Sequence, residues 1–414
     1  MNAKQQKLAK LLAKENLSSL QLSQRTGISQ PTVSRALKEL PVIKIGAGRI
    51  SRFALIEPDN CHPLFKVSEQ GELNQIATLY VQPNQRCILK SEHTTEAYTQ
   101  LPYFLTDLLP RGYLGEKWLQ AEGLEANEPD QWSLMQQIEF LTEYGADLPG
   151  NLVLGKKAAI KSLTLGNKTL RESEYPFWLQ GVVNAERVVG YLGGERPKFT
   201  AFTGMDHVLV KFSPRLDSKD AQALRYKDLL VCEQIALQTL SQAGLVVAQA
   251  KLVQSDRLYL QFKRFDRVNG KGRKGVLTLA ALQQAYGLDS ALSWPLVADQ
   301  LYQLNVISDE NRQVLHFVYA FAQLIGHKKM DARNLAFYFE EGKVLGLAPI
   351  YDVWPSRLWS ESGETSKSDW TPPLLFDVEP RIAQQAKDLA SYYYKRVFEN
   401  YLVSYETKKQ FNGL

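Results

Sequence analysis

The positive charge of this chain is concentrated in its first 55 residues. That segment contains ten basic and two acidic side chains, a net charge of +8. The whole chain of 414 residues carries +5, so the rest of the chain carries −3. Because the excess charge lies in so short a segment, the sequence predicts a small basic domain, suited to nucleic acid, on a nearly neutral body.

Apolar spacing in the basic segment predicts three helices followed by a hairpin. The leucines between positions 8 and 12 have the i, i+3, i+4 spacing of one buried helical face. A serine at position 18 or 19 can begin a second helix, which ends at Gly27, and Ser29 can begin a third. Two apolar runs flank residues 46–48, which are Gly-Ala-Gly, and this is a hairpin pattern.

The third predicted helix has an apolar face and a polar face. The polar face holds side chains that can meet base edges and phosphates: Gln30, Thr32, Ser34, Arg35 and Lys38. The basic side chains Arg49 and Arg52 lie on or near the hairpin. The pattern resembles a winged helix-turn-helix with residues 29–40 as the recognition helix, and the alternative is a basic three-helix bundle that contacts proteins. Since such domains usually read palindromes as dimers, we expect a homodimer on operator DNA.

The rest of the chain reads as a mixed α/β region followed by a helical region. Strand-like and helix-like segments alternate up to about residue 265, and long amphipathic runs follow at 279–286, 296–304 and 310–325. No apolar stretch approaches the ~18–20 residues that a membrane span needs. Three cysteines without CxxC spacing predict neither a disulfide framework nor a zinc site, so we expect a cytoplasmic protein.

Seven short motifs occur in the body in a particular order. They occupy residues 107–112 (DLLPRG), 144–150 (YGADLPG), 192–198 (LGGERPK), 208–212 (VLVKF), 264–267 (RFDR), 324–335 (LIG to DARNL) and 348–352 (APIYD). With these motifs the chain resembles the HipA family, the serine/threonine kinases of bacterial toxin–antitoxin modules, over residues 60–400.

The resemblance implies a multidomain α+β fold and a protein kinase activity. The implied domains are a winged helix-turn-helix at 1–57, an α/β N-lobe at 58–266 and a mostly helical C-lobe at 267–414, the last two forming a bilobal, protein-kinase-like body. The implied reaction transfers the γ-phosphate of ATP, with Mg²⁺, to a hydroxyl of an unknown protein substrate. The fused DNA-binding segment implies regulation of transcription.

The resemblance also assigns residues to the nucleotide. Gly193 and Gly194 let the backbone approach an anion, and Arg196 and Lys198 add positive charge, whereas alone this segment would read as a solvated turn. Lys211 lies within an apolar strand pattern and is implied to contact phosphates rather than to lie on an exposed edge. Lys263, Phe265 and Asp266 fall at the implied hinge between the lobes, where family members contact adenosine.

Two hard oxygen donors complete the implied site. Asn334 lies in the catalytic-loop motif and Asp352 in the metal-binding motif, and both side chains suit Mg²⁺ shared with substrate phosphates. In isolation they would read as a turn Asn and a capping Asp.

The chain departs from the family pattern at two places. Lys329 stands where the family has the catalytic Asp that accepts the hydroxyl proton, and Asp331 stands where the family has a His. A protonated lysine cannot act as a base but can neutralise phosphate charge, so Asp331 is the candidate base. Tyr191 stands where many members have the serine whose phosphorylation inactivates the kinase.

Three functions remain open on these residues. The first is a HipA-like kinase with its own DNA-binding domain, and the second is a nucleotide-binding transcription regulator without phosphoryl transfer. The third is a DNA-binding scaffold whose body only contacts proteins.

A literal GxGxxG at residues 270–275 lacks the strand-turn-helix context of a dinucleotide site, and we interpret it as a flexible basic loop.

Overall fold

The computed structural model describes most of the chain. It covers residues 1–48, 51–123, 129–164, 168–185, 192–328, 330–359 and 373–411. Three residues singled out above, Arg49, Tyr191 and Lys329, therefore lie outside the described residues.

The N-terminal segment folds as three helices and an antiparallel two-stranded ribbon, as its sequence predicts. These elements are α1 (Ala3–Leu12), α2 (Ser19–Thr26), α3 (Gln30–Glu39), β1 (Val42–Ile45) and β2 (Arg52–Leu55). Ser18 caps α2 by accepting from the Gln21 amide, and Gly27 ends this helix with φ of 70°. Ser29 occupies the N-cap position of α3, but its side chain makes no capping bond to the helix backbone. The leucines at 8 and 12 are fully buried, so the predicted apolar face of α1 is the core of this segment. We call residues 1–57 the head.

A five-stranded antiparallel sheet follows the head. Its order is β6-β5-β4-β3-β7, with β3 (Cys61–Val67), β4 (Leu73–Val81), β5 (Cys87–Ser91), β6 (Thr95–Tyr98) and β7 (Leu152–Leu154). Four helices accompany it: α4 (Tyr103–Thr106), α5 (Gly112–Ala121), α6 (Leu134–Tyr144) and α7 (Lys156–Thr164). Apolar side chains of this sheet and of α4, α5 and α6 form one core. We call residues 59–163 the middle domain.

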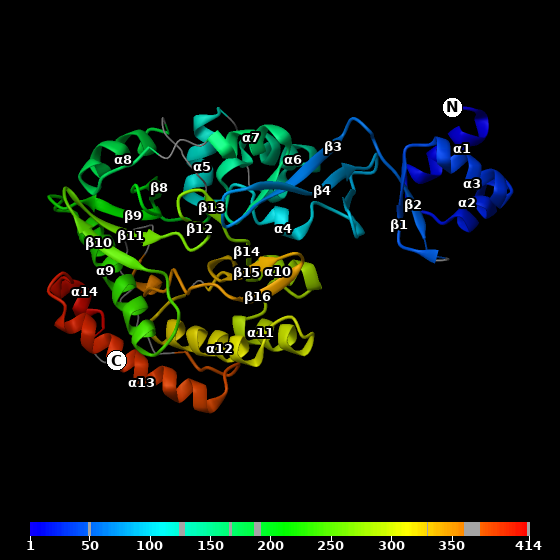
Figure 1. The fold of residues 1–414 in the computed structure, drawn as a ribbon. Helices are drawn as coiled ribbons and strands as arrows, with labels where there is room; N and C mark the ends of the chain where they lie inside the picture. Colours follow the sequence, from blue (N-terminus) through cyan, green and yellow to red (C-terminus); the bar gives the residue numbers. More distant parts are fainter. Residues whose placement is uncertain are drawn as a thin grey trace.

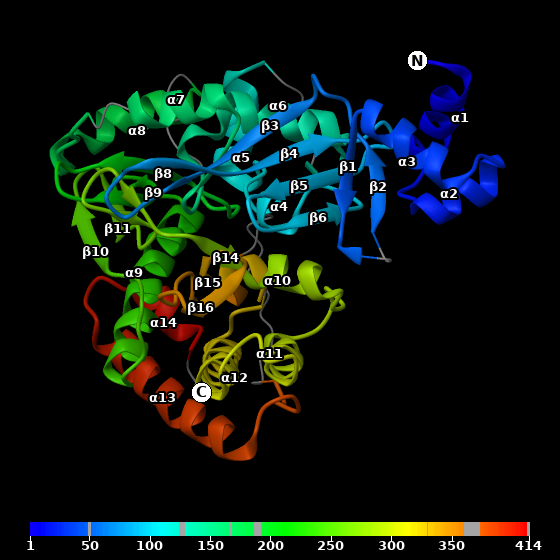
Figure 2. The ribbon, with the colours of Figure 1, turned by 45° about the vertical axis from the view of Figure 1, so that its right-hand side comes forward.

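The head is attached to the middle domain by direct contacts. The buried Gln82 side chain donates from Nε2 to Asn16 Oδ1 at 2.8 Å, and Asn84 Nδ2 donates to the Lys14 carbonyl at 3.1 Å. Ile43 and Ala54 of the ribbon share a small apolar core with Ile88 of β5. Figures 1 and 2 show the head at one end of the molecule, beside this sheet.

A second, four-stranded sheet carries the predicted strand lysine. Its order is β10-β11-β9-β8, with β8 (Lys198–Phe202), β9 (His207–Arg215), β10 (Ala250–Gln254) and β11 (Arg257–Lys263). The helices α8 (Tyr175–Val183) and α9 (Ala221–Gln242) belong to this part of the chain. The range 58–266, expected as one α/β lobe, thus contains two separate sheets.

The remainder is mainly helical, as predicted. It contains α10 (Leu279–Tyr286), α11 (Trp294–Gln303), α12 (Asp309–Leu324), α13 (Pro380–Glu399) and α14 (Tyr405–Lys409), with a small sheet of order β14-β15-β16 (Val276–Thr278, Ala336–Glu340, Lys343–Leu347). The three long amphipathic runs of the sequence correspond to α10, α11 and α12. Short 3₁₀ turns lie at Pro129–Gln131, Gly145–Asp147, Glu172–Glu174, Ala332–Asn334 and Ser356–Leu358. The main core joins α9 to α12 and α13, so the two sides of the body are packed together (Figure 1).

The GxGxxG segment is not the flexible basic loop that the sequence suggests. It forms an antiparallel ribbon of β12 (Arg267–Val268) and β13 (Gly272–Arg273), and Arg273 is buried. A Cβ on Gly272 would lie 1.9 Å from the Glu69 carbonyl oxygen. The glycine is there because another backbone passes it closely, which sequence spacing does not reveal.

The sequence also predicts that the chain has no membrane span and no disulfide framework. In the described ranges, no helix combines the length and apolar character needed to cross a bilayer. Cys61, Cys87 and Cys232 carry free thiols, and the last two are buried.

Candidate functional site

A cavity of about 650 Å³ lies where three parts of the body meet. Its walls come from the middle domain, from the four-stranded sheet with its preceding loop, and from the helical region. Nine of the predicted nucleotide and metal residues line it: Gly193, Gly194, Lys198, Lys211, Lys263, Phe265, Asp266, Asn334 and Asp352. The fold therefore brings together side chains that are up to 159 positions apart in the sequence.

The glycine loop of the cavity is held by the first motif. Gly194 has φ of 98°, and its carbonyl accepts from the Tyr113 amide at 3.1 Å. Gly112 lies so close that a Cβ on it would be 2.6 Å from the Gly194 carbonyl carbon. The DLLPRG segment thus positions the loop that the sequence assigns to phosphate.

Within the described part of the chain, two cations beside this loop have no carboxylate partner. Lys198 is 3% exposed and donates to the Gly193 carbonyl at 2.5 Å. Burial, together with the charge of Lys211, lowers the pKa of Lys198 to about 7. The guanidinium carbon of Arg196 lies 3.0 Å from the centre of the Trp354 ring, and among the described residues both terminal nitrogens are buried without a hydrogen-bond partner. Desolvated cations of this kind favour a polyanionic ligand.

Lys211 joins the two sides of the cavity. It lies on β9, is 4% exposed, and its Nζ is 2.6 Å from Glu233 Oε1 on α9 and 2.6 Å from Asp352 Oδ1. Burial alone would lower the pKa of Lys211, but these two carboxylates raise it above its usual range. Burial likewise acts against ionisation of Asp352, yet Lys211 and His327 hold the pKa of its carboxyl well below the usual range. Both groups are therefore charged at neutral pH.

Glu233 was missed by the sequence reasoning. It is fully buried on α9, and its Oε1 forms an ion pair with Lys211 Nζ on β9. The available signal was a single charged residue inside the mostly apolar run from Leu229 to Leu240. A lone charge in a helix pattern does not by itself say whether it faces water or a buried lysine.

Asn334 and Asp352 form the candidate metal position. Asn334 ends the 3₁₀ turn Ala332–Asn334, and Asp352 has φ of 57°, a conformation that Asp tolerates better than most residues. The ionised carboxylate and the carboxamide are hard oxygen donors in one cavity, which fits Mg²⁺. The described residues include no group of three or more His, Cys, Asp or Glu side chains able to hold a metal. The remaining ligands would have to come from substrate phosphates and water.

Asp331 is not among the residues that line the cavity. It is exposed, precedes the 3₁₀ turn and accepts from the Arg333 amide at 2.8 Å. It also pairs with Arg333 Nη1 at 3.3 Å. The structure thus gives Asp331 a capping role, and Lys329 is outside the described residues.

At the expected hinge, Lys263, Phe265 and Asp266 all line the cavity but have different partners within the protein. Phe265 lies 5.6 Å from the Tyr351 ring, and Lys263 pairs with Asp206 at 2.8 Å. Asp266 is enclosed by cations and accepts from Arg264 at 3.0 Å and from Arg267 at 2.6 Å.

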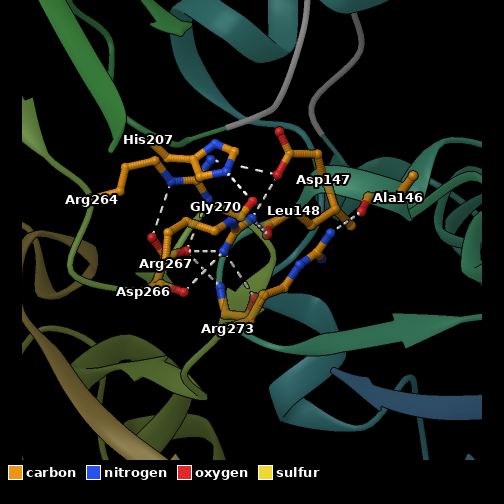
Figure 3. A network of polar contacts seen from close by, with 10 residues as sticks. Ala146, Asp147, Leu148, His207, Arg264, Asp266, Arg267, Gly270 and Arg273 are labelled. Carbon is orange, nitrogen blue, oxygen red and sulfur yellow. Dashed lines mark hydrogen bonds and ion pairs between the residues drawn. The ribbon is translucent and has the colours of Figure 1, made fainter. Parts of the chain in front are cut away.

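The enclosure of Asp266 belongs to a buried network that joins the hinge to the middle domain (Figure 3). Arg267 also pairs with Asp147 at 2.7 Å, and the Gly150 amide donates to Asp266 at 2.9 Å. Arg273 donates to the Ala146 carbonyl at 2.7 Å. Despite burial, Arg267 and Arg264 lower the pKa of Asp147 to about 2. The YGADLPG and RFDR motifs thus form a structural clamp.

The predicted nucleic-acid face of the head is accessible. Gln30, Ser34, Arg35 and Lys38 of α3 are exposed, and Thr32 is half-buried. Arg52 on β2 is exposed as well. The predicted apolar residues of the same helix are buried, so the polarity of α3 is as the sequence indicates.

Comparisons with known proteins identify relatives of the body in sequence and in structure. Residues 190–398 match the model of the HipA-like C-terminal domain, and residues 59–163 match the YjjJ-like toxin middle domain. The chain is 30% identical over 368 residues to Toxin YjjJ of Escherichia coli, covering 84% of this chain and 82% of that protein. HipA in its Shewanella oneidensis complex with HipB and operator DNA is 14% identical, with a TM-score of 0.55, over 84% of this chain and 93% of that one.

Proposed function

The chain belongs to the HipA family of toxins, and on that basis we propose that it is an ATP-dependent serine/threonine protein kinase with its own DNA-binding head. The observation that carries the proposal is the position of Lys211. It bridges Glu233 and Asp352 inside a cavity that is also lined by the glycine loop and Lys198, whereas Arg196 is buried against Trp354 and is not part of the lining. Phosphoryl transfer depends on this kind of positioning and charge stabilisation.

Each residue has a stated part in the proposed reaction. Gly193, Gly194, Arg196 and Lys198 would hold the phosphates, and Lys211 would orient them. Asn334 and Asp352 would hold Mg²⁺, which offsets negative charge on the phosphates. Lys263, Phe265 and Asp266 border the end proposed for adenosine.

The proposed transfer exchanges one phosphorus–oxygen bond for another. The acceptor hydroxyl oxygen forms a bond to the γ-phosphorus while the bond to the bridging oxygen breaks, leaving ADP. The hydroxyl proton goes to a base, for which Asp331 is the candidate, and Lys329 would neutralise phosphate charge. A shift of the loop at 330–334 would be needed to bring Asp331 to the acceptor.

One observation favours a second function. The Asp331 carboxylate caps a turn and pairs with Arg333 outside the cavity lining. Without a positioned base, transfer would be slower by about 10²–10⁴-fold. The body would then bind ATP and Mg²⁺ as a sensor and act as a nucleotide-binding transcription regulator.

Two measurements on one sample separate these functions. ATP with Mg²⁺ should raise the melting temperature of the purified chain, and γ-labelled ATP should label a protein acceptor. Asp352→Ala should abolish labelling, whereas Asp217→Ala, at an exposed carboxylate paired with Arg215, should retain it. Stabilisation without labelling supports the regulator, and no stabilisation at all contradicts both.

For the head we propose a winged helix-turn-helix that binds operator DNA, with a homodimer reading a palindrome. The support is the net charge of +8 in residues 1–55 and the exposed polar face of α3. Affinity should fall steeply between about 50 and 200 mM salt because bound cations are released from the DNA. Arg35→Ala should reduce discrimination between sequences, and Arg52→Ala should weaken binding to all sequences equally. Binding that is insensitive to salt would contradict the proposal.

A further inference from the structure

The cavity extends beyond the residues assigned to the nucleotide. One half is lined by the glycine loop, β9, the hinge and Asp352, as described above. The other half is lined by the middle domain between Gln100 and Gln137 and by the start of α10. The proposed nucleotide residues do not include any of the residues in this second group, so the nucleotide assignments leave this part of the lining without a ligand.

The second half has an apolar floor and a polar rim. Leu101, Leu108 and Leu109 are at most 4% exposed, and the partly buried Trp132 and Leu134 continue this surface. Exposed carboxamides border it at Gln100 and Gln284. An apolar surface with groups that can both donate and accept is suited to a polypeptide, whose backbone does the same.

The charged side chains Arg111, Arg333 and Asp107 of this half already have partners within the protein. Arg111 Nη1 donates to Asp130 at 2.8 Å, and Arg333 pairs with Asp331. Asp107 accepts from the Thr278 amide and hydroxyl, both at 2.7 Å. Because each of these groups is already engaged in an ion pair or in hydrogen bonds, the half favours an uncharged apolar side chain over an acidic or basic one.

The second half also adjoins the reacting end of the first. Arg333 and Asn334 come from the same 3₁₀ turn and both line the cavity. Asp107, just after α4, is bound to the residue that caps α10, and α4 and α10 lie against each other in both ribbon views (Figures 1 and 2). A ligand in this half therefore lies beside the position proposed for Mg²⁺ and the γ-phosphate.

We infer that this half binds the acceptor: a segment of a partner protein with a large apolar side chain close to its serine or threonine. The inference rests on the proposed function and adds the class of substrate. Most of the lining of this half belongs to residues 59–163, which match the YjjJ-like middle domain, and the start of α10 adds a smaller part from the HipA-like C-terminal domain. Acceptor choice is thus assigned to the middle domain.

The test measures binding, so it does not depend on catalysis. Labelled protein, loaded with Mg²⁺ and a non-hydrolysable ATP analogue, is applied to an array of serine peptides varied at each neighbouring position. Wild type should select Leu, Ile, Met or Phe over Ala or Asp at one position by about tenfold, as expected for burial of one large apolar side chain.

A matched pair of variants locates the binding surface. Trp132 and Trp118 both pack on Phe140, with ring centres at 5.9 and 4.8 Å, but only Trp132 lines the cavity. Trp132→Ala should reduce the selection to less than about threefold, whereas Trp118→Ala should preserve it. Selection that is absent in wild type, or unchanged in Trp132→Ala, would overturn the inference.

The rise in melting temperature caused by nucleotide is recorded on the same sample. This second measurement distinguishes failure of the proposed kinase function from failure of the proposed acceptor site. Peptide selection without any stabilisation by nucleotide would reject the proposed function, and with it the acceptor role, but would retain a peptide-binding surface in this half of the cavity. Stabilisation without peptide selection would reject only the acceptor surface.

Discussion

At the scale of single residues, Lys198 is the group whose charge depends most on what occupies the cavity. It is almost fully buried, and its pKa is lowered to about 7. A bound polyphosphate would favour the charged form and raise this pKa. Nucleotide binding above pH 7 should therefore take up a proton.

This uptake predicts a pH dependence of affinity. ATP–Mg²⁺ affinity should fall by up to about tenfold per pH unit between roughly pH 7.5 and 9, because Lys198 is then neutral in the empty cavity. Calorimetry in two buffers with different ionisation enthalpies measures the proton directly. Lys198→Arg, which stays charged, should remove both the slope and the uptake. A wild-type affinity that is constant over this range would disprove the assignment.

Residues differ in how far their sequence context reveals them. Lys211 and Asn334 stand within recognisable motifs, and the cavity contains both. Glu233 has no motif, because its role depends on α9 packing against β9, a contact between segments 22 positions apart. The spacing of the catalytic-loop motif was enough to select Asp331 as a candidate base. It does not predict the orientation of the side chain, because the carboxylate accepts a hydrogen bond from the nearby Arg333 amide.

At the scale of elements, the start of α5 supports the glycine loop. Gly112→Ala would place a Cβ 2.6 Å from the Gly194 carbonyl carbon, so the loop must move. We expect stabilisation by ATP–Mg²⁺ to be lost while the fold is retained, as judged by thermal shift and circular dichroism.

Gly123, just beyond the other end of α5, supplies the control. It has φ of 68°, close to the 65° of Gly112, but no atom of the described residues lies within 4 Å of its added Cβ. Gly123→Ala therefore carries the same backbone strain, about 1 kcal/mol, without the clash. If both variants respond to nucleotide alike, the support role of Gly112 is wrong.

The elements themselves were largely predictable, and their partners were not. Periodicity identified the three helices of the head and α10, α11 and α12, because each buries one clear face. The β12–β13 ribbon was missed, since its glycine and arginine are buried by the distant Glu69 backbone and the Ala146 carbonyl. Periodicity contains no information about such long-range neighbours.

At the scale of the whole molecule, the clamp in Figure 3 ties the middle domain to the hinge. The pKa of Asp147 is lowered to about 2 in the folded chain, against an ordinary value of 3.8. Its contribution to stability is therefore complete above about pH 4 and is lost as the pH falls toward 2. The free energy of unfolding should decrease over this interval.

Asp147→Asn should show how much the clamp contributes. It leaves Arg264 and Arg267 with one carboxylate fewer, and we expect destabilisation of about 3 kcal/mol near neutral pH. The difference from wild type should shrink as the pH approaches 3, measured by urea unfolding. Asp217→Asn, at an exposed pair, should change little at any pH. A difference that does not depend on pH would show that the Asp147 charge is not responsible.

The contacts of Gln82 and Asn84 with the head have a consequence for stoichiometry. Because the head is part of the same polypeptide and is packed against the body, every copy of the cavity comes with one copy of the α3 surface. Unequal expression cannot change this ratio, as it can when two functions reside on separate chains. Any shift in the balance between them must come from ligands, partners or changes within the chain itself.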